Sequence, residues 1–168
     1  MQTAKRVTLA ALALILTGAV AAQAQSNNAS ISVTATVQQP INVTAANALA
    51  FGNVLPGVNS TVGVASANAG RFDVIGQVST PVTLSFILPA DLSDGLGNLL
   101  PIGSFTGNHN TTNSPTVTGF TPANAPATFG ATLSGTGTLF VFVGATVSPA
   151  VNQAAGAYTG SVTMTVVY

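Results

Sequence analysis

The chain contains no cysteine and no glutamate, and only 4% of its residues are charged. Without cysteine it has no disulfide, so hydrophobic burial and sheet hydrogen bonds must hold the fold together. After residue 24 the charged side chains are those of Arg71, Asp73, Asp91 and Asp94. Nucleic acids and anionic lipid surfaces bind clusters of Lys and Arg. The composition therefore excludes both as partners.

Titratable and metal-binding side chains are equally scarce. The single histidine, His109, lies in a polar stretch over 108–114, where we expect a solvated side chain. One His and three Asp without Cys cannot supply a usual zinc site. The segment 91–98 lacks the ligand spacing and the closing Glu of a calcium loop, so a plain turn is expected. We predict no catalytic, cofactor-binding or metal-binding residue, and no enzyme.

The first 24 residues have the pattern of a secretory signal peptide. Lys5 and Arg6 precede an apolar run over 7–22, and Ala22-Gln23-Ala24 supplies the small-x-small site that signal peptidase accepts. The rival interpretation is a membrane anchor, but the run is shorter than the roughly 20 residues that cross a bilayer. We expect cleavage before Gln25 and export through the inner membrane to the periplasm, the cell surface or the medium. No later segment is long and apolar enough to enter the membrane.

The rest of the sequence is typical of β structure. Val and Thr are frequent, Gly, Asn and Pro recur at short intervals, and no stretch repeats its apolar residues with the period of a helix. The stretch 89–126 is expected to be a long, partly irregular connection with short strands inside. Closely spaced short strands predict an all-β sandwich or barrel. The predicted strands are 31–37, 41–44, 49–51, 61–65, 71–78, 82–88, 128–133, 137–147 and 157–168.

Two local features are also predicted. Arg71 and Asp73 are two positions apart on a strand, so they share a face and are expected to pair. Gly-Thr-Gly over 135–137 is typical of a hairpin turn, and no helix follows it that would make a phosphate site.

Both ends of the exported chain alternate apolar and polar residues, which indicates strands with one buried face. Pro40 cannot donate a ladder hydrogen bond, so it marks a joint between an N-terminal strand in 25–40 and a sandwich domain over 41–168. In a chain with such ends, the terminal strand can pair within its own sheet, or it can pair with the sheet of a neighbouring molecule. The apolar positions of the first segment are Ala29, Ile31, Val33, Ala35 and Val37. Those of the second segment include Tyr158, Val162, Met164, Val166 and Tyr168.

Three motifs in order carry a family resemblance. They are Ala35-Thr36-Val37-Gln38-Gln39-Pro40-Ile41, then Leu49-Ala50-Phe51-Gly52, then the closing stretch over 156–168. On these motifs the exported chain resembles the family filed as domain of unknown function 4402. The same skeleton is similar to spore-coat-protein-U-type subunits and archaic chaperone–usher pilins. Those pilins commonly carry a cysteine pair near the second strand, which this chain lacks, so the unknown-function family is the closer match.

The resemblance implies an immunoglobulin-like Greek-key β-sandwich that is completed by strand exchange. The N-terminal strand of one subunit would fill a groove in another copy or a related subunit by β-strand addition. A periplasmic chaperone and an outer-membrane usher would be the partners before assembly. On this interpretation Ala29, Ile31, Val33, Ala35 and Val37 are donor residues, and Tyr158, Val162, Met164, Val166 and Tyr168 belong to the acceptor strand and groove. The head-to-tail contact would propagate into a fibre.

Three functions stay open at the level of sequence. The first is a structural subunit of a bacterial surface fibre or coat. The second is a self-contained secreted binding module of the adhesin type, in which the first strand pairs within its own chain and 89–126 carries the binding site. The third is a hydrolase that depends on His109. For this function the sequence offers only the Ser, His and Asp residues that a catalytic triad needs.

Overall fold

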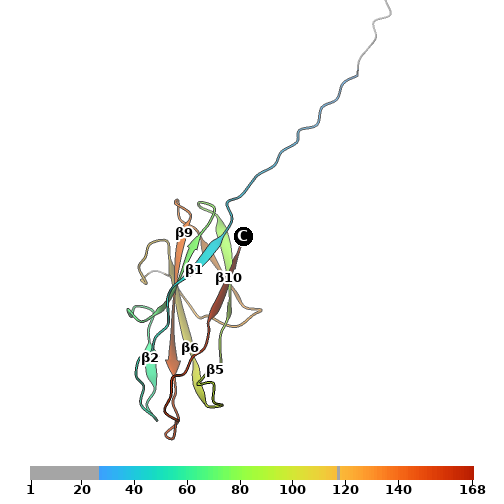
Figure 1. The fold of residues 1–168 in the computed structure, drawn as a ribbon. Helices are drawn as coiled ribbons and strands as arrows, with labels where there is room; N and C mark the ends of the chain where they lie inside the picture. The colour runs from blue at the N-terminus through green and yellow to red at the C-terminus, as the bar shows by residue number, and fades with distance from the viewer. Residues whose placement is uncertain (1–26, 117) are drawn as a thin grey trace, which may run out of the picture. The chain divides into compact units, whose positions relative to one another are not determined.

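The computed structural model describes residues 27–116 and 118–168. Within them it has ten β-strands and no helix (Figure 1), and so no apolar helix of membrane-crossing length. The expected signal peptide lies outside the described residues. The folded domain comprises Val37–Tyr168. Its strands are β1 (Asn42–Asn47), β2 (Ser60–Val62), β3 (Gly70–Ile75), β4 (Pro81–Ile87), β5 (Asp91–Ser93), β6 (Leu99–Asn110), β7 (Thr118–Phe120), β8 (Thr128–Thr132), β9 (Thr138–Val147) and β10 (Thr163–Val167).

The larger sheet has the order β1-β3-β9-β6-β5, and all of these neighbours are antiparallel. β9 is central because β6 covers one of its edges while β3 and then β2 cover the other. β7 extends the far edge of β6. The register of β6 shifts between Gly103 and Thr106. An irregularity of this kind bends a long strand, which allows β6 to follow the sandwich over its whole length.

The smaller sheet has the order β10-β4-β8. Leu84 of β4 lies opposite Val166 of β10 on one side and Phe129 of β8 on the other. Burial alternates along β4, because successive side chains of a strand point to opposite faces. The same alternation in β10 buries Met164 and Val166 and leaves the residues between them exposed.

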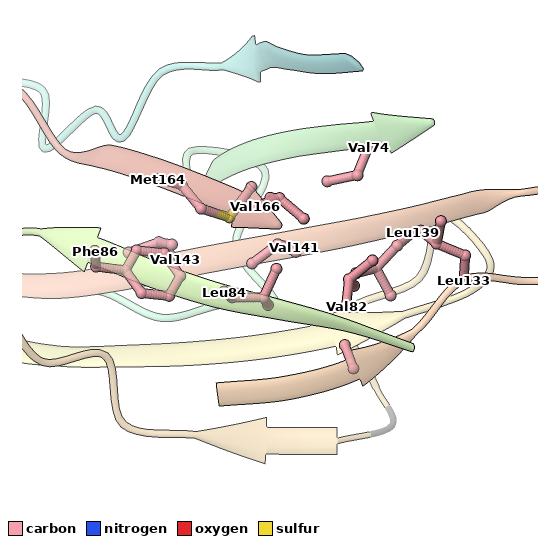
Figure 2. Packing of buried hydrophobic residues seen from close by; sticks show 11 residues of the cluster. Val74, Val82, Leu84, Phe86, Leu133, Leu139, Val141, Val143, Met164 and Val166 are labelled. Carbon is pink, nitrogen blue, oxygen red and sulfur yellow. The ribbon is translucent and has the colours of Figure 1, made fainter. Parts of the chain in front are cut away.

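The main core lies between the two sheets. Figure 2 shows apolar side chains from both layers meeting there, among them Leu84 of the smaller sheet and Val141 of the larger one. Both of these residues are fully buried. Each buried Val, Leu or Phe contributes about 1.5–3 kcal/mol relative to an exposed side chain. The alternation in the sequence therefore accounts for the two-layer packing. The buried members are Val74, Val82, Leu84, Phe86, Ala131, Leu133, Leu139, Val141, Val143, Met164 and Val166.

The strand order is that of an immunoglobulin-like sandwich. In that fold one sheet has the order A-B-E-D and the other contains C, F and G. Here β1, β3, β9 and β6 occupy the A, B, E and D places, and β4 and β10 occupy C and F. The predicted all-β sandwich is therefore confirmed. Within the described part of the chain, no strand occupies the G place beyond β10.

Some predicted strands are not formed, or are formed only in part, in the single chain. Residues 27–41 lie in no strand, since alternation supplies an apolar face but does not supply the neighbour whose hydrogen bonds define a strand. Residues 49–51 lie in a loop that turns at Gly52, where φ is +64°. In the closing segment only 163–167 form a strand, and before it Thr159 makes an isolated bridge to Ser93.

The stretch 89–126 is more regular than predicted. It contains β5, β7 and the twelve-residue strand β6. The glycines of β6 suggested a loop, but Gly107 allows close packing. A Cβ built at Gly107 would lie 2.5 Å from the ring of Phe120. The small residue therefore lets an aromatic ring of β7 lie directly on the strand backbone.

The predicted hairpin turn over 135–137 joins β8 to β9. The Ser134 hydroxyl accepts hydrogen bonds from the backbone N–H groups of Thr136 at 3.1 Å and Thr138 at 2.9 Å. Gly137 adopts a φ of +77°, a conformation that costs a side-chain-bearing residue free energy. This turn prediction is confirmed.

Candidate functional site at an open sandwich edge

At one edge of the sandwich, the outermost strand of each sheet pairs with a single neighbouring strand. In the described chain, β1 pairs only with β3 and β10 pairs only with β4. Contacts across this edge show that the two strands lie near each other. A Cβ built at Gly76 would lie 2.8 Å from the Tyr168 hydroxyl and 3.4 Å from Ile41. The backbone edge of β10 that faces away from β4 is therefore open to another strand.

An apolar cavity of about 780 Å³ opens at this edge. Its walls come from two loop segments, 45–56 after the start of β1 and 153–162 before β10. Its floor is a second buried cluster, which includes Leu100, Ile102 and Val147. Leu49, Phe51, Leu92 and Tyr158 pack against that cluster and also line the cavity. The cavity has the size of pockets that bind small molecules or side chains.

The loop before β10 is fixed by Tyr158. Its hydroxyl donates a hydrogen bond to the carbonyl of Ala154 at 2.8 Å and accepts one from the Gln153 amide nitrogen at 2.8 Å. The backbones of Thr159 and Ser93 exchange two hydrogen bonds of 2.9 Å. These contacts hold the wall in place beside β5 while leaving the cavity open, which preorganises the site.

The other end of the open edge is closed by a small polar cluster. The Tyr168 hydroxyl accepts a hydrogen bond from the backbone N–H of Gln77 at 2.7 Å and donates one to the carbonyl of Gln39. The backbone N–H of Gln39 in turn donates to the Gln77 side chain at 3.2 Å. We call these three residues the clasp. The clasp fixes the chain just before Pro40 against the end of β10.

The residues that the resemblance assigned to the acceptor differ in their surroundings. Tyr158 and Val162 line the cavity. Met164 and Val166 are buried in the main core, and Figure 2 shows them on β10. Tyr168 belongs to the clasp. Only the first two residues of the set are therefore brought together at the cavity.

Sequence reasoning missed most of the cavity wall. Leu49 and Phe51 line it, although their segment was predicted as a strand and not as part of a site. The signal that could have found them is their apolar character inside a Gly- and Pro-rich loop, because loops in globular domains are normally polar. Leu92 and Leu100 also line the cavity, and they were not singled out because the stretch 89–126 was expected to be a partly irregular connection.

The donor residues assigned by the resemblance are all exposed. Their set comprises Ala29, Ile31, Val33, Ala35 and Val37, and none of them lies in a strand. Ile31 and Val33 expose 88% and 86% of their surface. Exposed β-branched residues at alternate positions form an apolar stripe on an extended chain, with Ser and Thr between them.

His109 is not the solvated loop residue that we expected. It lies in β6 opposite Val141 of β9, so it shares the inner face with the core. Its ring centroid is 6.0 Å from that of Phe120. Burial lowers the pKa of the imidazole. The polar neighbours of His109 in the sequence misled the prediction, because every second residue of β6 points the other way.

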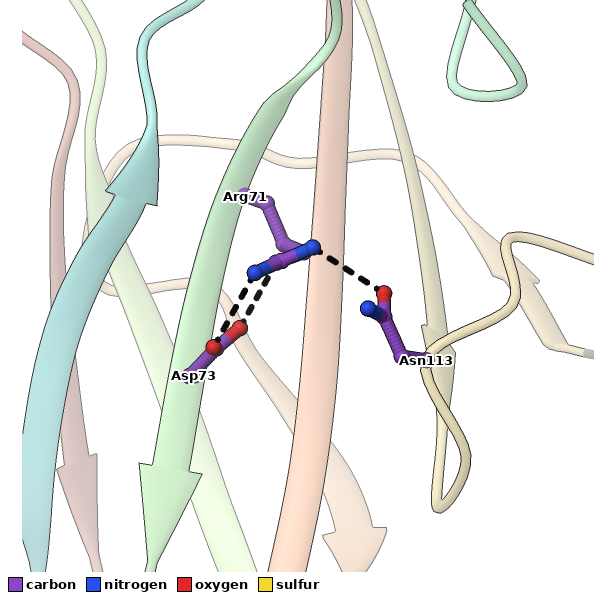
Figure 3. A network of polar contacts seen from close by, with 3 residues as sticks. All are labelled: Arg71, Asp73 and Asn113. Carbon is purple, nitrogen blue, oxygen red and sulfur yellow. Dashed lines mark hydrogen bonds and ion pairs between the residues drawn. The ribbon is translucent and has the colours of Figure 1, made fainter. Parts of the chain in front are cut away.

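Three of the four charged side chains after residue 24 are engaged in local structure. Arg71 pairs with Asp73 through Nε–Oδ1 at 2.8 Å and donates to Asn113 at 3.1 Å (Figure 3), which confirms the predicted pair. The Asp94 carboxylate accepts hydrogen bonds from the Asn98 side chain and the Leu96 N–H, and these lower its pKa. The described residues contain no group of three or more His, Cys, Asp or Glu placed to bind a metal ion.

Comparison with known protein families gives a match over the sandwich domain. Residues 41–168 match the family described as Domain of unknown function (DUF4402). The chain belongs to this family. The match begins directly after Pro40 and ends at Tyr168, so it covers the sandwich and both walls of the cavity. No curated protein matches the chain.

Proposed function

We propose that this DUF4402 protein is a non-enzymatic structural subunit of a bacterial surface fibre or coat, assembled by donor-strand complementation. In this assembly the segment 29–37 of one copy pairs with the free edge of β10 in another. The observation that supports this function is the joint presence of an unpaired β10 and an apolar cavity beside it. A soluble domain has little other reason to leave a sheet edge and its core open together.

The donor segment has the pattern that the open edge requires. An added strand forms backbone hydrogen bonds with β10 and turns alternate side chains toward the space between the sheets. Ile31 and Val33 then leave solvent, and burial of each contributes about 1.5–3 kcal/mol. Ser32 and Thr34 stay on the solvent face. The backbone ladder adds to this gain, and the ordering of the segment offsets part of it.

The proposed assembly also requires that the exported chain is protected before it polymerises. An unfilled groove exposes apolar surface and unpaired backbone groups, which favour aggregation. We propose that a periplasmic chaperone covers the groove until an outer-membrane usher delivers the subunit to the surface. The resemblance to chaperone–usher pilins supports these partners. A protein with this role needs neither a catalytic residue nor a cofactor.

The experiment is a charge scan of the two faces of the donor segment. The double variant Ile31→Asp/Val33→Asp places two carboxylates where apolar groups are buried, and we expect polymers to disappear. The matched control, Ser32→Asp/Thr34→Asp, adds the same charge to the solvent face and should keep its polymers. Electron microscopy and size-exclusion chromatography of material shed from the producing cell measure both.

The scan also tests the main alternative, a self-contained binding module. If the wild type is a monodisperse monomer that folds without a chaperone, and neither double variant changes its oligomeric state, the result favours that alternative and contradicts strand exchange. A synthetic peptide of residues 27–38 gives an independent readout. If it raises the melting temperature of a chain that lacks residues 1–37, the groove accepts the segment.

A further inference from the structure

The mouth of the cavity carries an exposed apolar rim. Leu55, Val58 and Val151 expose 68%, 56% and 86% of their surface. Two loops present them, and the loops are joined because the Gly57 N–H donates to the carbonyls of Pro149 at 3.2 Å and Ala150 at 3.0 Å. Pro56 and Pro149 line the cavity itself. The rim is therefore a fixed surface that continues directly from the groove.

The opposite end of the domain is where the chain leaves toward its donor segment. The clasp holds Gln39 against Gln77 and Tyr168. The next residue, Val78, is exposed in the turn after β3. This end of the domain, which we call the joint end, is thus also apolar at its surface. It fixes the position of the residues that directly follow the donor segment.

The chain between donor and domain is very short. A single residue, Gln38, separates Val37 from the clasped Gln39. An extended chain covers at most about 3.6 Å per residue, so Val37 lies within about 7 Å of Gln39. When Val37 is seated in the groove of another copy, the joint end of its own domain must lie against that groove.

The clasp determines at which end of the groove this contact occurs. The Tyr168 end of the open edge is already occupied by Gln39 and Ile41 of the acceptor itself. The residues that connect the donor segment of another copy to its own domain do not fit in the same place. The donor's domain must therefore sit at the other end, where the rim surrounds the cavity.

We propose that the rim of Leu55, Val58 and Val151 is a second docking surface, and that its partner is the joint end of the next copy of this chain, around Gln77 and Val78. This inference rests on the proposed strand exchange and adds a domain–domain contact to it. No charged side chain belongs to either surface, so the contact is apolar. It limits how far consecutive domains can tilt.

A charge-complementation experiment on the full exported chain tests the proposal. In a polymer of Val151→Asp, each joint holds a carboxylate against an apolar surface, and we expect the yield of polymer to fall at least about tenfold. Val78→Lys should have a similar effect. The chain that carries both substitutions places Asp against Lys at every joint and should recover most of the wild-type yield. Ile87→Asp, at a position on the outer face of β4 that is 65% exposed, is the control and should assemble normally.

The outcomes separate this inference from the function on which it rests. If Val151→Asp assembles as well as Ile87→Asp while Ile31→Asp/Val33→Asp does not, strand exchange survives and the rim contact is wrong. If Ile31→Asp/Val33→Asp also assembles, strand exchange itself is wrong. Because the chain has no cysteine, Val151→Cys with Val78→Cys offers a second readout. Oxidised polymers of this variant should give a ladder of covalent multimers, and Ile87→Cys with Val78→Cys should give none.

Discussion

The hydroxyl of Tyr168, at the end of β10, lies 2.7 Å from the backbone nitrogen of Gln77, just past the end of β3. β3 belongs to the larger sheet and β10 to the smaller one. One phenol therefore joins the two layers at the edge where no strand does so in the described residues. Because it also bonds Gln39, it links the end of β10 to the chain just before Pro40.

We expect Tyr168→Phe to lower the free energy of unfolding by about 1 kcal/mol. The substitution keeps the ring and removes two hydrogen bonds, whose net contributions are small because water replaces them at a partly exposed site. Urea unfolding of the purified monomer measures the change. Unaltered stability would mean that the clasp orients the joint without stabilising the domain.

Gly137 and Gly135 provide a matched pair in the β8–β9 turn. A Cβ at Gly137 would lie 2.2 Å from the Gly76 carbonyl oxygen, and the residue has a φ of +77°, whereas a Cβ at Gly135 meets nothing within 4 Å. We expect Gly137→Ala to cost at least about 2 kcal/mol and Gly135→Ala to be nearly neutral. Thermal unfolding of both variants checks this. Equal costs would contradict the turn geometry.

Val166 and Val167 test which face of β10 is buried. Val166 is 9% exposed in the main core, and Val167 is 52% exposed. Val166→Ala should destabilise the domain by about 2 kcal/mol through lost burial and a residual cavity, and Val167→Ala should cost less than about 0.5 kcal/mol. Denaturant titrations compare the two. The reverse order would show that the strand is shifted by one residue.

His109 gives the domain a dependence on pH. Burial lowers its pKa in the folded state, whereas the pKa of a histidine in an unfolded chain is about 6.5. The unfolded chain binds more protons between these two values, so stability is complete above about pH 6.5 and decreases as the pH falls through this window.

The chain has one His and no Glu, so His109 is the side chain that dominates titration between about pH 5 and 7. We expect the melting temperature of the wild type to fall between about pH 7 and pH 5. The variant His109→Gln should show a much smaller fall, as differential scanning calorimetry would record. An equal fall in both proteins would assign the effect to another group.

Much of the fold was predictable because burial repeats along the strands. The β-rich apolar patterns of the segments that became β4 and β9 located both strands to within one residue, since their side chains had to enter the core. β10 was located only in part, because the predicted strand began at 157 and the observed strand begins at Thr163. β6 was missed because Gly and Asn are poor strand formers by propensity. Long-range pairing with β9 and the packing of Phe120 on Gly107 overrode that propensity.

The open edge was harder to predict than the strands. Alternation at both ends suggested a donor and an acceptor, but it could not reveal that loops would form the groove walls. Leu49 and Tyr158 are about one hundred positions apart in the sequence and meet only through the sandwich. Likewise, the clasp depends on contacts between Gln39, Gln77 and Tyr168 that no local pattern specifies.

The pairing of Arg71 with Asp73 determines how this molecule responds to dissolved salt. With Arg71, the only Lys or Arg after residue 24, already paired, the uncompensated side-chain charges of the domain at neutral pH are Asp91 and Asp94, which lie together at β5 and the turn that follows it. Electrostatic repulsion between two copies of the domain is thus weak, and dissolved ions have little of it to screen.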